Sequence, residues 1–305
     1  MPDHTAVLRS LASILALLGL GAVLSAAEVS HTPLALKKGG TAEAPVVVDG
    51  KGMIIDLGID VTAHAWRKEG DLWTASARLS EWDPVAPGMF TGLFIDDLPV
   101  LVGLDQPAQA KREKGDERNR YLPPAALPAG QMGCTADGLI YFRWPTGVKP
   151  DGAHLFIPPK PNTSCVSIEC PYITVRNVTA RHASNDGFNI HGAYQGIRLE
   201  NVHAFANTDE GISAHDRVEM QVVDSEIAWN ASYDGGVVDA GDSTTSYDRC
   251  VVHDNLSGKA AAFKFFGGTH RVTNTTIYNQ KIDFRLNGQG VFSKENITNK
   301  GFITK

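Results

Sequence analysis

The sequence lacks the features that mark several large classes of protein. Basic residues number 28 against 34 acidic residues, so the net charge is -6 and no positive excess is available for binding nucleic acid. Only 4 cysteines occur, at spacings that match no common zinc pattern, and either disulfides or isolated thiols fit them. The 30 glycines follow no Gly-x-y period, which excludes a collagen-like chain. An apolar content of 43% with 20% charged residues is that of a globular protein.

Long apolar runs are also missing, except at the N-terminus. Arg9 precedes an apolar stretch over residues 11–24, which small residues follow. This order is typical of a secretory signal peptide, and the stretch is shorter than the ~20 residues of a membrane span. We expect residues 1–27 to be removed by cleavage near Ala26-Ala27. The mature chain, with no other segment apolar enough to span a membrane, is then expected in the medium, in the periplasm or at the cell surface.

The C-terminal half repeats itself. Residues 177–192 align without a gap over residues 201–216, at an offset of 24, so that His191 falls over His215. A fixed period in the twenties is typical of a solenoid, and the short runs of alternating apolar and polar residues have the period of strands. Helical repeats are longer, and the leucine-rich skeleton is absent. The sequence therefore predicts an all-β parallel β-helix in which one asparagine per rung stacks at a turn: Asn207, Asn230, Asn255 and Asn279.

These repeats resemble those of a known family. The segments N-V-T-A-R-H-A-S-N-D-G-F-N-I-H-G and N-V-H-A-F-A-N-T-D-E-G-I-S-A-H-D are similar to rungs of the secreted right-handed parallel β-helix proteins, which include pectate-lyase-like polysaccharide lyases and several glycosidases. Upstream, residues 66–75, 93–97 and 139–145 resemble segments of a small β-rich module that some β-helical carbohydrate-active enzymes carry near the N-terminus. The resemblance implies a right-handed solenoid with such a module inserted. Polygalacturonase and pectate lyase site patterns are incomplete here, so the resemblance assigns no catalytic residue.

The chain divides accordingly into four parts. After the signal peptide at 1–27, the first β-helix rungs are expected at 28–61, the inserted module at 62–152 and the main repeats at 153–305. Residues 296–305 show no recognisable cap for the last rung, which leaves open that the repeats continue.

The period also stacks polar residues. Successive strand residues point to opposite faces, and neighbouring rungs lie ~4.8 Å apart. At an offset of 24, His191, His215 and Asp239 are predicted to form one outward column, with a second column of acidic residues at the adjoining turn and an outward lysine on the next rung. The candidate catalytic residues are Asp186, Glu210, Asp239, His191, His215 and Lys264, and the candidate substrate-binding residues are Asn189, Asp234, Asp242, Trp229 and Tyr233.

This inventory fits more than one chemistry. Hydrolysis of a glycoside needs two carboxyl groups at a defined separation, whereas elimination from a uronic acid needs a base and cations, often Ca²⁺ held by carboxylate oxygens. We predict a secreted enzyme that cleaves a polysaccharide, with a glycoside hydrolase that uses the Asp and Glu cluster as the preferred form. The alternatives are a polysaccharide lyase or uronate epimerase, with Lys264 or His215 as base, and a non-catalytic glycan-binding or adhesin β-helix. No cofactor is required by the sequence, Ca²⁺ being one that the lyase would use.

Overall fold

The computed structural model describes residues 27–79, 91–103, 121–135, 137–159, 162–232, 234–256 and 261–303. All but the last residue of the expected signal peptide lies outside these ranges, as does Tyr233. Within them the only helix is the short 3₁₀ turn η1 (Pro124–Ala126), and the described part of the chain has no helix that is long and apolar enough to cross a membrane. The described elements are otherwise strands, as an all-β prediction requires.

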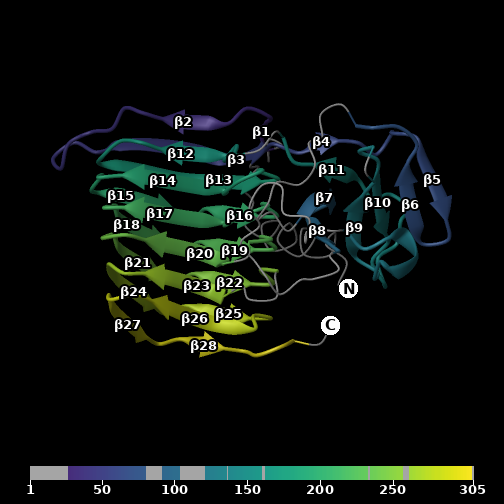
Figure 1. The fold of residues 1–305 in the computed structure, drawn as a ribbon. Coiled ribbons are helices and arrows are strands. Elements are labelled where there is room, and N and C mark those ends of the chain that lie inside the picture. Colours follow the sequence, from purple (N-terminus) through teal and green to yellow (C-terminus); the bar gives the residue numbers. More distant parts are fainter. Residues whose placement is uncertain are drawn as a thin grey trace, which may run out of the picture.

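Stacked parallel strands form the larger part of the molecule (Figure 1). A seven-stranded sheet takes one strand from each rung, in the order β2 (Leu34–Leu36), β12 (Val166–Ile168), β14 (Phe188–Gly192), β17 (Ile212–Asp216), β20 (Gly235–Ala240), β23 (Ala261–Phe266) and β26 (Ile282–Asn287). A 13-stranded sheet takes the remaining strands: β1 (Val29–Ser30), β3 (Val46–Asp56), β13 (Ile173–Arg181), β15 (Ile197–Glu200), β16 (His203–Phe205), β18 (Glu219–Val223), β19 (Glu226–Ala228), β21 (Thr244–Asp248), β22 (Val251–His253), β24 (Thr269–Thr273), β25 (Thr276–Tyr278), β27 (Val291–Glu295) and β28 (Thr298–Asn299). The parallel β-helix prediction is confirmed.

The core of the solenoid consists of side chains that repeat at the same position of each rung. Phe188, Ile212, Val237 and Phe263 lie side by side on neighbouring strands of the seven-stranded sheet, and all are fully buried. Because alternate residues point outward, the same strands carry polar side chains on the opposite face of the sheet. That outer face is the surface on which the sequence places its candidate site.

An asparagine ladder closes one turn of the solenoid. The Asn207 Nδ2 donates to Asn230 Oδ1 at 2.8 Å, and the Asn230 Nδ2 donates to Asn255 Oδ1 at 2.9 Å. The prediction is correct for these three residues and wrong for Asn279, whose Nδ2 donates instead to Asp254 Oδ1 at 3.0 Å. The next ladder position is held by Gln280, whose Nε2 donates to the Asn255 backbone carbonyl at 3.2 Å. A glutamine is long enough to reach the same turn, so the pattern of asparagines alone misplaces the last rung by one residue.

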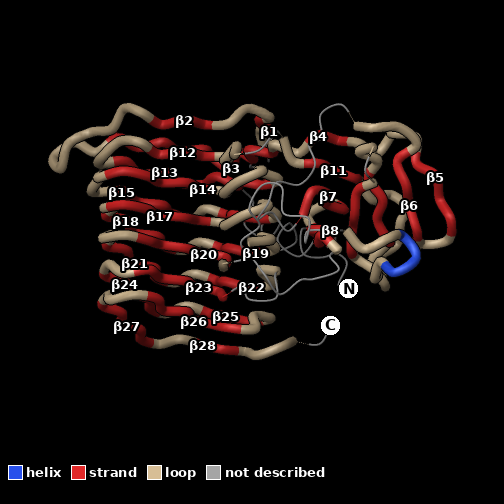
Figure 2. The backbone as a smooth tube through the Cα atoms, in the orientation of Figure 1, coloured by secondary structure: helices blue, strands red, loops and turns tan. Residues whose placement is uncertain are grey.

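A second, smaller sheet lies beside the solenoid (Figure 2). Its eight strands run in the order β4 (Ile59–Asp60), β11 (Leu155–Ile157), β7 (Thr91–Ile95), β8 (Leu98–Val102), β9 (Gln131–Cys134), β10 (Ile140–Arg143), β6 (Leu72–Ala75) and β5 (Trp66–Glu69). All pairs are antiparallel except β8 and β9. We call this unit the eight-stranded module; it has its own apolar core, which includes Trp73, Phe142 and Trp144.

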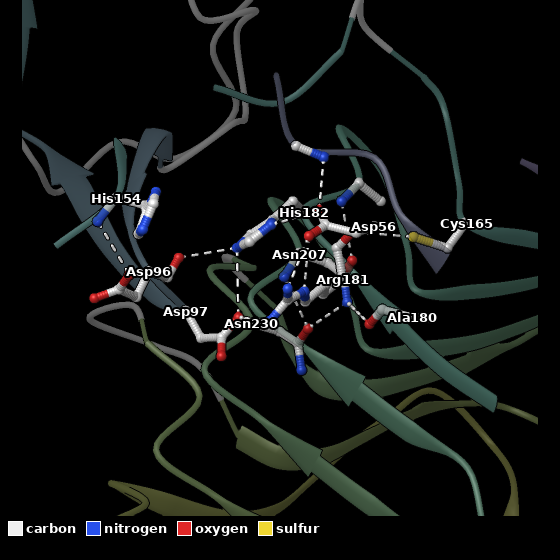
Figure 3. Close-up of polar contacts among 12 residues, drawn as sticks. Asp56, Asp96, Asp97, His154, Cys165, Ala180, Arg181, His182, Asn207 and Asn230 are labelled. Carbon is white, nitrogen blue, oxygen red and sulfur yellow. Dashed lines mark hydrogen bonds and ion pairs between the residues drawn. The ribbon is translucent and has the colours of Figure 1, made fainter. Parts of the chain in front are cut away.

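Hydrogen bonds and ion pairs join the module to the solenoid (Figure 3). The His182 ring, which is completely buried, contacts Asp56 Oδ1 through Nδ1 at 2.8 Å and the Asp96 backbone carbonyl through Nε2 at 2.9 Å. Arg181 donates to Asp56 Oδ2 and to Asp97 Oδ1, both at 2.9 Å. Although burial opposes ionisation, the hydrogen bond and charge of His182 and the charge of Arg181 lower the pKa of Asp56 to about 2. Since Asp96 and Asp97 follow β7, this network fixes the module against β3 and β13.

The four cysteines are buried free thiols: Cys134, Cys165, Cys170 and Cys250. Burial raises the pKa of all four, to about 11 for Cys134 and about 12 for Cys250, so these thiols stay protonated and unreactive. Of the two alternatives that the spacing allowed, isolated thiols are the correct one.

Candidate active site

The outer face of the seven-stranded sheet is hollowed where β14, β17 and β20 pass. Two adjoining volumes of about 350 and 400 Å³ share Asn185, Asn189 and His191, and together we call them the sheet cleft. The first also takes in Asp186, Asp209, Glu210, His215, Ser232, Asp234, Val238, Ala240 and Phe266, and the second Asn162, Ser164, Ser167, Glu169, Gly192, Tyr194 and Asp216. Six of the eleven candidate residues therefore line one continuous groove: Asp186, Asn189, His191, Glu210, His215 and Asp234.

Asp186 lies at the floor of the cleft and accepts several hydrogen bonds. Its Oδ2 accepts from the Ser213 hydroxyl at 2.6 Å and from the Asn189 Nδ2 at 2.8 Å, and its Oδ1 accepts from the Glu210 backbone N–H at 3.2 Å. Burial, reinforced by the charge of Asp209, raises the pKa of Asp186 to about 7. Hydrogen bonds from the Glu210 side chain, the Ser213 hydroxyl and the Glu210 backbone N–H act in the opposite direction, because hydrogen bonds to a carboxylate stabilise its ionised form.

Glu210 lies one rung further along and has a different environment. Its Oε1 accepts one hydrogen bond, from the Ser232 hydroxyl at 2.6 Å. Burial is the first cause that raises the pKa of Glu210 well above its ordinary value, and the charges of Asp209 and Asp186 add to it. Glu210 is thus the member of the pair that most readily holds a proton at neutral pH.

Asp209 completes a group of three acids. One oxygen from each of Asp186, Asp209 and Glu210 lies within 4.8 Å of the others, the one such group of potential metal ligands in the described ranges. Burial raises the pKa of Asp209 as well. Because three carboxylates this close cannot all remain ionised without compensation, the group holds either a proton or a cation. Oxygen ligands of this kind suit Ca²⁺, which would neutralise the same charge that a shared proton neutralises.

Two histidines form a platform beside the acids. His191 and His215 are direct partners on β14 and β17, and their rings stack with centroids 4.3 Å apart and planes 15° apart. Burial, followed by the charge of His191, lowers the pKa of His215, so its ring is neutral at pH 7. The Asp216 Oδ2 lies 4.0 Å from the His191 Nδ1. A flat neutral ring next to carboxyl groups offers both an apolar face and a hydrogen-bonding edge.

Lys264 points outward as predicted, but its ammonium group is already paired. The Lys264 Nζ forms an ion pair with Asp234 and lies 4.2 Å from the centroid of the Phe266 ring. The side chain is buried. Because a carboxylate and an aromatic ring already engage this ammonium group, Lys264 is not free to act as the base of an elimination.

The prediction that Asp239 points into the cleft is wrong. Asp239 pairs with Ala214 on β17, and it is Val238 that pairs with the outward Ser213. The Asp239 side chain therefore faces the solenoid interior, where it is 0% exposed and accepts hydrogen bonds from the Thr245 hydroxyl at 2.7 Å and the Tyr247 hydroxyl at 2.9 Å.

Asp239 faces inward because two residues are inserted in the turn before β20. Gly211 follows Asn207 by four positions, whereas its structural counterpart Gly236 follows Asn230 by six. A Cβ atom at Gly211 or Gly236 would come within 2.7 or 2.5 Å of the ladder asparagine on the next rung, which identifies the equivalent positions. Gly235, which the offset of 24 selects, is one residue too early, and every later residue of β20 changes face.

The remaining candidates are not brought to the cleft by the described structure. Asp242 lies exposed in the turn after β20, with its backbone N–H donating to the Asp216 carbonyl at 2.7 Å. Trp229 follows β19 in the other sheet and has a left-handed φ of 60°. Neither lines the described cleft, and Tyr233 lies outside the described residues.

Two serines of the site, Ser213 and Ser232, are harder to identify from the sequence than the acids and histidines. Ser213 lies between the inward Ile212 and Ala214, so strand alternation places it outward beside Asp186. Ser232 lies in the turn that contains the insertion, where the offset of 24 no longer identifies equivalent positions. Asp209 reads as a turn residue in the sequence, and only the close contact with its neighbours shows that it belongs to the acidic group.

Comparison with known proteins places the fold. No family model and no curated protein matches the chain. Among solved structures, one described as the complex structure of XylC with xylose aligns over 90% of this chain and 60% of its own, with a TM-score of 0.54 and 12% identity. Another, described as a glycoside hydrolase, aligns over 90% of this chain and 88% of its own, with a TM-score of 0.51 and 9% identity. The chain thus spans less than two thirds of XylC, and the likeness at this identity is one of fold.

Proposed function

We propose that the chain is a glycoside hydrolase that acts outside the cytoplasm on a neutral glycan, with the sheet cleft as its active site. The observation that carries the proposal is the pairing of Asp186 and Glu210 on adjacent rungs, in one open cleft, with unequal surroundings. Two carboxyl groups whose environments separate their protonation are the requirement of glycoside hydrolysis. The fold shared with a structure described as a glycoside hydrolase is in keeping with it.

The hydrogen bonds assign the two roles. Asp186, with the Ser213 hydroxyl, the Asn189 amide and a backbone N–H as donors, is the group prepared to carry negative charge. Glu210, with a single hydroxyl donor and a strongly raised pKa, is the group prepared to donate a proton. Asp209 contributes charge that keeps the proton on Glu210.

The close approach of the acids favours retention of configuration. Retaining enzymes hold their carboxyl groups ~5–5.5 Å apart, whereas inverting enzymes leave ~6.5–9.5 Å for a water molecule. One oxygen of Asp186 lies within 4.8 Å of one oxygen of Glu210, which is less than the room that an inverting enzyme leaves for water. In the first step Glu210 protonates the leaving oxygen while Asp186 forms a bond to the anomeric carbon. In the second step Glu210 takes a proton from water, and the resulting hydroxide displaces Asp186.

The charge of the cleft argues against a uronate substrate. Its described lining includes Asp186, Asp209, Glu210, Asp234 and Glu169, and no arginine. The protein's own charges would repel a polyanionic chain, and Lys264, one of the two bases considered for an elimination, is paired with Asp234. A lyase or epimerase is therefore less well supported than a hydrolase. The complex that XylC forms with xylose makes neutral pentosides a reasonable first choice of substrate.

A panel of neutral aryl glycosides and polysaccharides tests the proposal. The mature chain from Glu28 onward should release the aglycone or new reducing ends, without the absorbance of unsaturated products, and NMR of the first product should show the anomer of the substrate. Asp186→Asn should abolish this activity, whereas Asp242→Asn, a matched carboxylate change outside the described cleft, should not. Unsaturated products, or full activity in Asp186→Asn, would overturn the assignment.

A further inference from the structure

The eight-stranded module contains a cavity of its own. It has a volume of about 510 Å³ and is lined by the rings of Trp66, Trp73 and Trp144, with Lys68 and His154 among the polar groups around them. None of its lining residues lines the sheet cleft. Nothing in the proposed hydrolysis uses this cavity, so its construction calls for a separate explanation.

The three tryptophan rings form an aromatic wall of the cavity, and this wall is rigid without a ligand. Trp73 packs against Trp144 at a centroid distance of 4.6 Å, and Trp66 meets Phe142 edge to face at 5.4 Å. The indole N–H of Trp66 donates to the Val61 carbonyl at 3.1 Å, and that of Trp144 donates to the Val148 carbonyl at 2.9 Å. Because these polar atoms are satisfied internally, the rings are held in fixed positions. Trp73 and Trp144 are 8% and 6% exposed, so Trp66 is the ring most accessible to a ligand. Fixed rings lose little entropy when a ligand packs on them.

Lys68 shows what kind of group the wall attracts. Lys68 and Trp73 are direct partners on β5 and β6, and the Lys68 Nζ lies 3.8 Å from the centroid of the Trp73 ring. The face of the Trp73 ring attracts positive charge through its π electrons. Lys68 is an exposed residue of β5, so its long side chain can move away from the ring. The C–H groups of a sugar ring carry a small positive charge and fit the same face. The displaced ammonium group would then be within reach of the sugar hydroxyls.

The rim supplies hydrogen-bonding groups of both signs. The His154 Nδ1 lies 3.6 Å from the Asp60 Oδ2, and the two side chains are 59% and 52% exposed. Thr62 and Asp151 lie on the same rim. Aromatic rings flanked by donors and acceptors, without an excess of either charge, suit a neutral polyhydroxylated ring better than an ion or an apolar ligand.

We infer that the module cavity is a second glycan-binding site, which holds one sugar unit of a neutral polysaccharide against Trp66 and Trp73 at a distance from the hydrolytic centre. Binding at this site requires no bond cleavage. Its test is therefore independent of the proposed hydrolysis, and either can fail without the other.

Retardation in native gels that contain arabinoxylan, glucomannan or mixed-linkage β-glucan tests the inference. Every protein carries Asp186→Asn, so that the polysaccharide stays intact. We expect Trp66→Ala to weaken the apparent affinity about tenfold, as loss of a central tryptophan contact does, and His154→Ala to weaken it measurably. The control Arg67→Ala lies on the other face of the same strand and should match the parent.

Folding is checked separately, because Trp66 also packs on the module core. His154 is exposed enough for His154→Ala to keep the parent's melting temperature, so a loss of retardation in that variant cannot be a folding defect. Equal retardation of all the variants by every gel that retards the parent would overturn the inference. So would a parent that none of the three polysaccharides retards.

Discussion

The replacement Asp239→Asn separates a structural acid from a catalytic one. Asp239 lies inside the solenoid, where burial raises its pKa to about 7. When ionised, Asp239 accepts from the Thr245 hydroxyl. Once protonated, it can instead donate to that hydroxyl, which then donates to the His270 Nδ1 at 2.8 Å, while the His270 Nε2–H donates to the Gly267 carbonyl at 2.7 Å. Burial lowers the pKa of His270, in agreement with a neutral ring in this chain of hydrogen bonds. An asparagine reproduces the neutral carboxyl group, with its amide as the donor.

The effect on stability has a definite sign. Below pH about 4 the Asp239 carboxyl is protonated in both the folded and the unfolded chain. Between pH about 4 and 7 the folded chain keeps a proton that the unfolded chain releases, so the free energy of unfolding falls as the pH rises. The interval between the ordinary pKa of 3.8 and about 7, at about 1.36 kcal/mol per pH unit, corresponds to about 4 kcal/mol. Asp239→Asn carries no such proton and does not undergo this loss.

Urea unfolding of both proteins from pH about 4 to 8 measures this difference. The free energy of unfolding of the asparagine variant should rise relative to that of the wild type as the pH increases, by about 4 kcal/mol above pH 7. The variant should also retain glycosidase activity. Parallel curves of unfolding free energy against pH would refute the buried protonated carboxyl. A folded variant without activity would return Asp239 to the set of catalytic residues.

Other perturbations give equally direct outcomes. Glu210→Gln should slow hydrolysis of glycosides with poor leaving groups by about 10²–10⁴-fold yet spare aryl glycosides with acidic phenols, which need no proton; equal losses would exclude the acid role. EDTA should leave turnover unchanged if a proton rather than a cation neutralises the acids, and activity restored by added Ca²⁺ would show the reverse. Asn230→Ala should lower the free energy of unfolding in urea by about 1–3 kcal/mol, because Asn207 loses its partner; an unchanged midpoint would contradict the ladder. His182→Phe leaves Asp56 without its imidazole and should lower the melting temperature, whereas a wild-type melting curve would mean that the junction does not depend on this contact.

The sequence predicts the fold well because a solenoid repeats its own constraints. Each rung needs inward apolar residues at the same positions, so His191 and His215 can be aligned by counting, and the structure pairs them directly. The acids Asp186 and Glu210 come from the same two rungs and are brought together for the same reason. Where the period is unbroken, residues one period apart in the sequence are neighbours in the structure.

Counting fails where a turn changes length. Asn230 follows Asn207 by 23 residues, one fewer than the period of 24, and two further residues are inserted between Asn230 and Gly236. As a result, β20 begins one position later than the count predicts, and a shift of one residue in a strand exchanges its two faces. Asp239 is misplaced for this reason alone. No propensity in the local sequence distinguishes Gly235 from Gly236 as the start of the rung; the distinction comes from packing against Asn255 on the rung beyond.

That inserted turn also shows how such a scaffold can acquire new chemistry. The ladder asparagines and the core residues resume their alignment after it, so the extra length leaves the stack of rungs intact. The same turn carries Ser232, whose hydroxyl donates to Glu210 at 2.6 Å, and Asp234, which forms an ion pair with Lys264. The turn between an asparagine and its glycine is therefore a site where length can vary almost independently of the core. A designer, or natural selection, can alter the environment of the acid there one residue at a time.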